Sequence, residues 1–297
     1  MIRPVNFGFN EETAASNAFQ NRNADKSGVK EKALREFDGM VAILCENGVE
    51  VTVVEDTPEP YTPDSIFPNN WVSFHANGEI FLYPMQAENR RLERREDIIT
   101  KLEDQFAVKH IIDLSRFEHE NKFLEGTGSM VLDRENKIAY ACISPRTDRE
   151  VLAIFCEQTG YKEVSFHAYD EYHQAIYHTN VLMCIGSEFA VICLDTITEP
   201  EEKNAVTSIL KLTHKEIISI SFEQMNQFAG NMLEVKNKAG ETLVVMSQNA
   251  YNALNQSQRD ALGKFGKLVF ADINTIENNG GGSARCMMAE VHLPLGS

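Results

Sequence analysis

The chain has 297 residues, of which 43% are hydrophobic and 24% are charged, and its formal net charge is −16. This composition is that of an ordinary folded protein with enough apolar side chains for a large core. Nucleic acids and anionic membranes need a basic surface, so the charge argues against both as partners and suits a cationic or neutral small molecule.

The sequence also shows no pattern typical of a membrane span or a secretory signal. No apolar run approaches the ~18 residues of a membrane span, and the N-terminal residues lack the apolar core of a secretory signal. The six cysteines form no disulfide framework, and no Cys-x₂-Cys or His-x₃-His pair occurs, so we expect no metal site. These features predict a cytoplasmic protein.

The predicted elements begin with an amphipathic helix at residues 29–44 and a strand at 49–54. From there one order of elements recurs: a polar turn leading into a pair of strands, then a helix, then another strand. The expected strand pairs are residues 63–74 with 79–83, 125–132 with 137–142, 178–184 with 189–194, and 230–235 with 242–246. The helices that follow cover about 89–106, 148–159, 200–213 and 256–264, and the strands after them cover 110–114, 162–166, 216–220 and 267–270. A fifth turn and strand at 282–289 has no obvious partner strand.

The unit strand–strand–helix–strand therefore occurs five times, with no low-complexity linker between copies. Units of this kind closed around an axis leave only short, protected sheet edges. We expect an α/β protein of five pseudo-repeats arranged as a five-bladed propeller, with residues 1–297 forming a single domain.

Each unit has a polar or reactive residue in the turn that leads into its first strand. These residues are Asp64, Glu125, His178, Asn231 and Cys286, and they are separated by 61, 53, 53 and 55 positions. If every unit places this residue at the same structural address, the five side chains converge near one end of the axis. Asn231 is interpreted as a turn residue, because amides hydrogen-bond their own backbone in turns.

The converging residue types suggest covalent chemistry on a nitrogen-rich carbon. Cys286 follows Gly280, Gly281 and Gly282, and glycines allow close approach of a ligand to the chain. A thiolate at Cys286 is a nucleophile, and His178 is a general acid and base. Asp64 and Glu125 suit a planar group that carries N–H donors, such as a guanidinium or a ureido group. The other five cysteines, Cys45, Cys142, Cys156, Cys184 and Cys193, lie in apolar patterns and are expected in the core.

These motifs resemble the guanidine-modifying, or amidinotransferase, superfamily. The matching residues are Asp64 in a Pro-Asp…Asn-Asn turn, Glu125 in Glu-Gly-x-Gly, His178 in His-Thr-Asn, and Cys286 after the glycines. That superfamily includes arginine deiminase, dimethylarginine dimethylaminohydrolase and glycine amidinotransferase, and its members have the five-bladed pentein fold. The resemblance spans essentially the whole chain and is nearest to bacterial arginine-deiminase-related proteins proposed to act in citrulline utilisation.

The resemblance implies a mechanism without a cofactor. Cys286 would attack the guanidino or ureido carbon, and His178 would protonate the departing nitrogen and later deprotonate the hydrolytic water. Glu125 would orient His178, and Asp64 would bind substrate nitrogens. Further candidate substrate-binding residues are Asn69, Asn70, Asn180 and Arg285, of which Arg285 suits a substrate carboxylate. The expected partner is a small guanidino or ureido molecule, and a homodimer is compatible with the resemblance.

Two positions depart from arginine deiminases, which typically carry an aspartate three residues after the glutamate and another two residues after the histidine. Here these positions are Gly128 and Asn180. Each change removes a negative charge that would grip a guanidinium, and a lost charged hydrogen bond is worth roughly 1.5–3 kcal/mol. A neutral ureido substrate such as citrulline is therefore a hypothesis alongside arginine, methylated arginines and agmatine.

Two alternatives remain open from the sequence. An amidinotransferase would use the same covalent intermediate but transfer the amidino group to an amine, and a non-catalytic pentein protein would only bind its ligand.

The basic cluster at residues 90–97 alternates with acids in a helical pattern and is interpreted as a solvated helix face.

Overall fold

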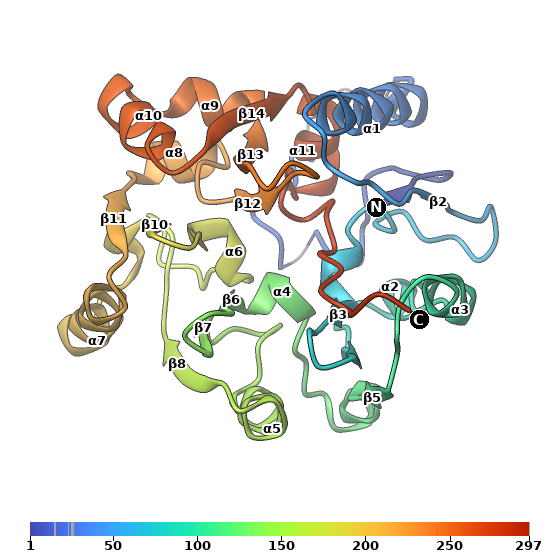
Figure 1. Cartoon of the computed structure of the whole chain (residues 1–297), viewed down its shortest axis with the longest axis horizontal. Helices are drawn as coiled ribbons and strands as arrows, with labels where there is room; N and C mark the ends of the chain where they lie inside the picture. Colours follow the sequence, from blue (N-terminus) through green and yellow to red (C-terminus); the bar gives the residue numbers. More distant parts are fainter. Residues whose placement is uncertain (15, 23, 25–26, 297) are drawn as a thin grey trace.

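The computed structural model describes residues 1–14, 16–22, 24 and 27–296. Within them, four three-stranded sheets and one two-stranded sheet surround a common centre, and the longer helices lie on the outside (Figure 1). The chain is thus an α/β protein built from several small sheets, as the repeated pattern predicts.

The four three-stranded sheets share one topology. In each, two consecutive strands pair antiparallel, and the strand that follows the helix joins the second of them in parallel. The sheets contain β3 (Val72–Phe74), β4 (Glu79–Leu82) and β5 (His110–Asp113); β6 (Val131–Asp133), β7 (Ile138–Cys142) and β8 (Lys162–Phe166); β9 (Met183–Ile185), β10 (Phe189–Ile192) and β11 (Glu216–Ser219); and β12 (Leu233–Lys236), β13 (Thr242–Ser247) and β14 (Lys267–Ala271). The order strand–strand–helix–strand therefore holds in these four units.

The fifth unit has two paired strands, not three. β1 (Ile2–Arg3) runs parallel to β2 (Val54–Glu55), and α1 (Val29–Glu46) lies between them in sequence. The strand expected at residues 49–54 is wrong for most of its length, because only its last residue pairs. The partner of β2 is the N-terminal end of the chain, which the sequence pattern did not identify. A complete five-bladed propeller is consequently not established by the strand pairing.

Five helices lie near the predicted helical segments: α2 (Glu88–Arg91), α3 (Glu96–Glu103), α5 (Arg149–Thr159), α7 (Pro200–Leu212) and α10 (Gln256–Gly263). The sequence pattern does not predict three others: α8 (Phe222–Asn226), α9 (Gln248–Ala253) and α11 (Asn274–Gly280). The single helix expected at 89–106 is wrong, since α2 and α3 are separate. Start signals are visible in the sequence: Asp148 accepts hydrogen bonds from the backbone of Glu150 and Val151, which caps the first turn of α5.

The core lies between the sheets and their helices. Helix α1 buries Ala33, Phe37, Met40 and Leu44, which fall on one face at the i, i+3, i+4 spacing. This face belongs to the same apolar cluster as Val269 of β14. Cys45 is exposed on α1, so the expectation that it lies in the core is wrong, whereas the other four predicted core cysteines are buried.

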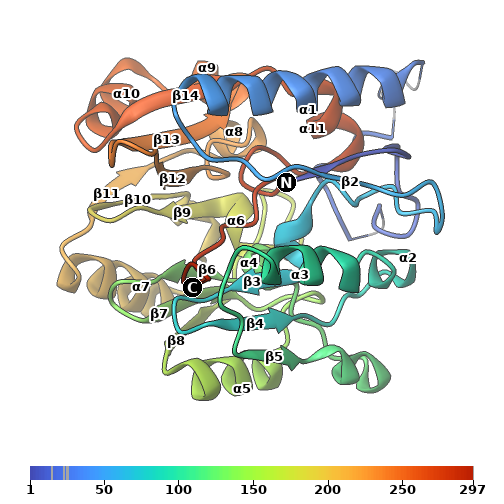
Figure 2. The same ribbon diagram turned by 45° about the vertical axis from the view of Figure 1, so that its right-hand side comes forward.

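Short helical turns come just before the first strands and occupy the middle of the molecule. They are the 3₁₀ turn η1 (Pro68–Asn70), α4 (Gly126–Ser129) and α6 (Thr179–Leu182). Figures 1 and 2 show α4 and α6 at the centre, enclosed by the sheets. Glu125 and His178 immediately precede α4 and α6, so the topology directs both residues to the middle.

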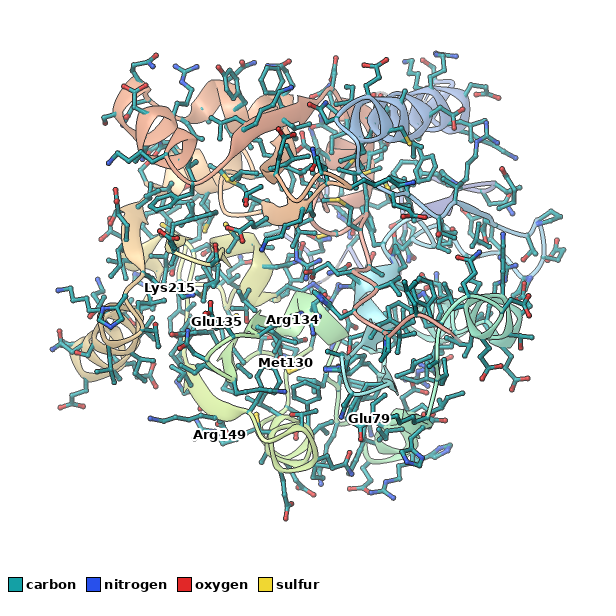
Figure 3. The ribbon with its side chains drawn as sticks, viewed as in Figure 1. Glu79, Met130, Arg134, Glu135, Arg149 and Lys215 are labelled. Carbon is teal, nitrogen blue, oxygen red and sulfur yellow. The ribbon has the colours of Figure 1, made fainter. Side chains whose placement is uncertain are left out.

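Buried charge also links neighbouring sheets. Lys215, labelled in Figure 3, is nearly fully buried and lies 3.2 Å from Asp133 of β6, and its Nζ donates to the backbone oxygens of Gly186 and Ser187. A buried ammonium needs such partners, because an unpaired charge in the interior is costly.

In the described part of the chain, no helix is both long and apolar enough to cross a membrane.

Candidate active site

His178 and Glu125 form a buried pair at the centre of the molecule. The His178 Nε2 atom lies 2.7 Å from Glu125 Oε2, and the side chains are 3% and 0% exposed. Glu125 Oε1 accepts a hydrogen bond from the backbone of Gln86 at 2.9 Å. The carboxylate is therefore held at both oxygens, and it fixes the orientation of the imidazole.

The electrostatic surroundings keep the His178 imidazole neutral and the Glu125 carboxylate ionised. Burial lowers the pKa of His178 to about 4, although the contact with Glu125 opposes this shift. Burial acts to raise the pKa of Glu125, but Arg146 and His178 outweigh it and hold that pKa below its usual range. At neutral pH the imidazole is therefore neutral and the carboxylate is ionised, as a general base and its orienting partner require.

Cys286 lies in a turn that two asparagine amides contact. Asn180 Nδ2 and Asn231 Nδ2 each lie 3.3 Å from the Cys286 sulfur. The backbone N–H of Cys286 donates to the Ser283 oxygen at 2.9 Å. The thiol is 5% exposed. The structure thus brings Asn180, a predicted substrate-binding residue, to the predicted nucleophile.

Asp64 is the second buried carboxylate of the site. Its Oδ2 accepts hydrogen bonds from Asn10 at 2.8 Å and Thr13 at 3.3 Å, and it lies 3.9 Å from Arg90. Its Oδ1 is buried and has no hydrogen-bond partner. Burial raises the pKa of Asp64, while Arg90 and Asn10 oppose that shift. A positive group bound at Oδ1 would favour the ionised carboxylate.

Asn69 and Asn70 lie in η1 with their side chains buried. Asn70 Oδ1 accepts a hydrogen bond from Arg90 at 2.8 Å, and because an arginine only donates, Asn70 Nδ2 is a donor without a partner. Both side-chain polar atoms of Asn69 are likewise buried and unpartnered. Buried polar atoms normally have partners, so this cluster of open donors and acceptors is where a polar ligand is expected to bind.

Arg90 and Glu93 are components of the site that sequence reasoning placed wrongly. They belong to the cluster at 90–97 that was expected on a solvated face, yet they are 2% and 3% exposed. Arg90 binds both oxygens of Glu93 at 2.9 Å and also donates to Asn70. A charge-rich helical pattern does not distinguish solvated charges from paired buried ones, so the burial depends on the tertiary neighbours.

Arg146 is a second arginine that sequence reasoning missed. Its guanidinium lies 3.4 Å from Glu125 Oε2 and stacks over the Tyr177 ring, with 4.9 Å between the guanidinium carbon and the ring centroid. It also donates to the Ser16 hydroxyl at 2.7 Å. This fixed positive charge explains why Glu125 stays ionised in a buried position. No spacing or motif signalled it.

The N-terminal segment closes over this cluster. Asn10 and Thr13 contact Asp64, Ser16 contacts Arg146, and Gln20 donates to the backbone of Asn279 at 3.1 Å. The cluster is buried as a result. A substrate that enters from this side has to displace these contacts.

Arg285 is bound by the C-terminal segment. Its guanidinium donates to the Met288 oxygen at 3.0 Å and to Glu290 at 3.1 Å, so a substrate carboxylate would have to compete with Glu290. Arg285, Thr127 and Asn180 are among the residues that line a cavity of about 790 Å³, together with Arg134 and Glu135, which Figure 3 labels near the turn between β6 and β7. The predicted site residues Cys286, His178, Glu125 and Asp64 are not among the residues that line it, so the candidate site is the buried cluster.

The Glu-Gly-x-Gly sequence has a steric explanation. Gly126 has φ = 48°, and a Cβ there would lie 2.3 Å from the Asn69 oxygen. A Cβ on Gly128 would lie 2.4 Å from Asn70 Nδ2 and 2.8 Å from His178 Nδ1. The aspartate typical of arginine deiminases at this position therefore does not fit here unless Asn70 and His178 shift.

We expect Gly128→Ala to reduce turnover at least 10-fold and to destabilise the fold by about 1–3 kcal/mol, since overpacking displaces the imidazole and the Asn70 amide. Turnover and urea unfolding measure the two effects. Gly39→Ala is the matched control, because nothing lies within 4 Å of its added Cβ in α1 and alanine favours a helix by about 0.5–1 kcal/mol. Unchanged turnover in Gly128→Ala would contradict the steric argument.

Among the described residues, no group of three or more His, Cys, Asp or Glu side chains is arranged to hold a metal ion. The chemistry of the cluster is that of a thiol, an imidazole and carboxylates. These groups suffice for nucleophilic attack and proton transfer.

Comparison with known families gives one match across the chain. The family described as N,N dimethylarginine dimethylhydrolase, eukaryotic, matches residues 3–293. None of the curated protein sequences compared with the chain matches it.

Several solved structures have the same fold. The substrate-bound N-terminal domain of ArgZ, an arginine dihydrolase from the ornithine–ammonia cycle in cyanobacteria, has a TM-score of 0.76 and 15% identity and covers 99% of this chain and 97% of that one. Unliganded AgrE has a TM-score of 0.76 and 18% identity, and the match covers 100% of this chain but 39% of AgrE. A dimethylarginine dimethylaminohydrolase adduct with 4-chloro-2-hydroxymethylpyridine has a TM-score of 0.62 and 17% identity, covering 87% and 90%.

Proposed function

Because the chain belongs to the N,N-dimethylarginine dimethylhydrolase family, we propose that it hydrolyses a guanidino or ureido C–N bond of an arginine-like molecule with Cys286 as the nucleophile. The observation that carries the proposal is the buried cluster in which His178 pairs with Glu125 and two amides contact the Cys286 sulfur. A protein that only binds its ligand has no need for this combination.

The proposed reaction proceeds in two halves. The thiol gives its proton to neutral His178, and the sulfur attacks the central carbon. The imidazolium protonates the departing nitrogen, the C–N bond breaks, and the enzyme carries a thiouronium, or a thiocarbamate from a ureido substrate. His178 then takes a proton from water, the oxygen attacks the same carbon, and the C–S bond breaks to regenerate the cysteine. Glu125 stabilises each imidazolium that forms.

The open polar atoms support a ureido substrate alongside a guanidino one. Asp64 Oδ1 and Asn180 Oδ1 are unpartnered acceptors that suit N–H groups, whereas Asn70 Nδ2 is an unpartnered donor. A guanidinium offers donors alone, but a ureido group also has an oxygen that accepts from Asn70. With Gly128 and Asn180 in place of carboxylates, the pocket carries less negative charge than one built for a guanidinium.

Release of ammonia or an alkylamine from citrulline, arginine, methylated arginines and agmatine tests the proposal. We expect turnover of citrulline with a kcat/KM at least equal to that of arginine, because the ureido oxygen can accept a hydrogen bond from Asn70 Nδ2. Two ammonia molecules per arginine would indicate a dihydrolase, the activity named for the similar ArgZ structure. Efficient turnover of arginine alone, with one ammonia released, would rule out the ureido preference and leave the hydrolase intact.

Added glycine distinguishes the amidinotransferase alternative, because a transferase would form a new amidino product and a hydrolase would not.

The fifth unit is proposed to complete a five-bladed propeller, with the segment after Cys286 occupying the place of its inner strand. All six cysteines are free, which fits the reducing cytoplasm. The single domain and the homodimer remain predictions.

A further inference from the structure

The surroundings of the Cys286 sulfur suit a thiolate better than a thiol. Asn180 Nδ2 and Asn231 Nδ2 both lie 3.3 Å from the sulfur, whereas the nearest side-chain acceptor for a thiol proton, Asn231 Oδ1, is at 3.8 Å. A thiol is a weak acceptor, and hydrogen bonds to an ionised acceptor are about twice as strong as neutral ones. Two convergent N–H donors therefore stabilise the charged form preferentially.

The orientation of the Asn231 amide is fixed by its other contacts. Its Oδ1 accepts from the Arg285 backbone N–H at 3.0 Å, and its Nδ2 also donates to the Asn180 backbone oxygen at 3.0 Å. Rotating the amide by 180° would place an oxygen against an oxygen and a nitrogen against an N–H, so the assignment of the two atoms follows from the partners. The side chain is 0% exposed.

The fold places Asn231 between two parts of the site. A Cβ on the preceding Gly230 would lie 2.4 Å from the Val181 oxygen, so the segment before β12 packs directly on the turn of α6. From there Asn231 reaches Asn180 of α6 on one side and the Arg285–Cys286 turn on the other. It thus joins the turn that carries His178 to the turn that carries the nucleophile.

We infer that Asn231 is a catalytic residue whose side-chain amide, together with that of Asn180, stabilises the Cys286 thiolate. The inference rests on the proposed function and extends it. The amides act twice, when the thiol loses its proton before attack and when the sulfur leaves the carbon during hydrolysis of the intermediate. In both steps negative charge develops on sulfur while the donors are already in position.

In the described part of the chain, the side chains hydrogen-bonded to the Cys286 sulfur are the uncharged Asn180 and Asn231. Among the titratable groups of the site, Tyr177 interacts electrostatically with Cys286, and Arg146, Glu125 and Asp64 interact with the same tyrosine. His178 is neutral at rest, Arg146 is bound to Glu125, and the Arg285 guanidinium is bound to Glu290. The amide dipoles are accordingly the direct stabilising contacts of the sulfur.

Asn231→Ala and Asn231→Asp test the inference through alkylation of Cys286 by iodoacetamide, followed across pH 6–10 by peptide mass spectrometry. Loss of one donor is expected to slow alkylation at pH 7 about 10-fold, because one hydrogen bond to the sulfur is lost. Turnover should fall by at least the same factor. Asn231→Asp keeps an acceptor for the Arg285 N–H but places an oxygen against sulfur, so it should lose more reactivity than Asn231→Ala.

A structural role would give the reverse order, since aspartate preserves the contact with Arg285 and alanine does not. Asn136→Ala, in the turn between β6 and β7, is the matched control and should alkylate as the parent protein does. Parent-like alkylation and turnover in both Asn231 variants would overturn the inference and leave the hydrolase proposal standing. Absence of turnover in the unsubstituted protein on every guanidino and ureido compound would instead refute the proposed function.

Discussion

Cys286→Ala is expected to reduce turnover by on the order of 10⁴- to 10⁶-fold, the range seen when an enzyme loses its covalent nucleophile. Alanine leaves no atom to attack the substrate carbon, and the remaining groups are arranged around sulfur. Cys286 is buried but smaller than most core residues, and among the described residues the side-chain partners of its sulfur are Asn180 and Asn231, so the fold should tolerate the change. Ammonia release under saturating substrate measures the loss.

Mass spectrometry of acid-quenched reactions gives a second readout of the same prediction. The unsubstituted protein should carry a substrate-derived mass on the peptide that contains Cys286, and Cys286→Ala should carry none. Cys45→Ser is the matched control, because Cys45 is exposed on α1 and should be silent in both assays. An adduct on another cysteine, or turnover in Cys286→Ala within 10-fold of the unsubstituted protein, would identify a different nucleophile.

The main elements of the fold could be predicted because the repeats impose a regular spacing. In each of the four units with a three-stranded sheet, the polar residue comes a few residues before the first strand, and the strand order is the same each time. This regularity places Glu125 and His178 ahead of α4 and α6, where they meet at 2.7 Å. The fifth unit broke the pattern, since its strand β2 pairs with the distant N-terminus.

The supporting residues of the site could not be predicted in the same way. Arg90 is buried only because Glu93, Asn70 and Asp64 surround it, and nothing in its local charge pattern records those contacts. Arg146 reaches Glu125 from the turn before α5, with no recurring position in the repeat. Residues of the N-terminal segment lack periodicity altogether, although Asn10 contacts Asp64. Their roles arise from tertiary proximity, which residue spacing does not encode.

Asn231 shows that its position in the repeat and its residue type point to different roles. The spacing places it in the same series as His178 and Cys286, whereas asparagine in a turn usually bonds the backbone. In the structure its amide does both, because it contacts the Cys286 sulfur and also accepts a hydrogen bond from the Arg285 backbone.

Glu125→Gln is expected to lower kcat by about 10²- to 10³-fold, within the usual contribution of general acid–base catalysis. Glutamine can still bond the imidazole, but it lacks the charge that stabilises the imidazolium in each half of the reaction. The Glu125 contact raises the pKa of His178 against burial and Arg146, so its removal should move that pKa below about 4. The acid limb of kcat/KM set by His178 should then shift to lower pH.

Nitrogen NMR of labelled histidine follows the same group without substrate. His178 should remain neutral from pH 8 down to about pH 5 in the unsubstituted protein, and Glu125→Asp, which keeps the charge, should restore much of the shift lost in Glu125→Gln. Glu118→Gln is the matched control, since Glu118 binds Arg94 and does not contact the imidazole. A His178 midpoint that is unchanged or rises in Glu125→Gln would show that Glu125 does not stabilise the imidazolium. A midpoint near the ordinary 6.5 in the unsubstituted protein would instead show that burial does not keep the imidazole neutral.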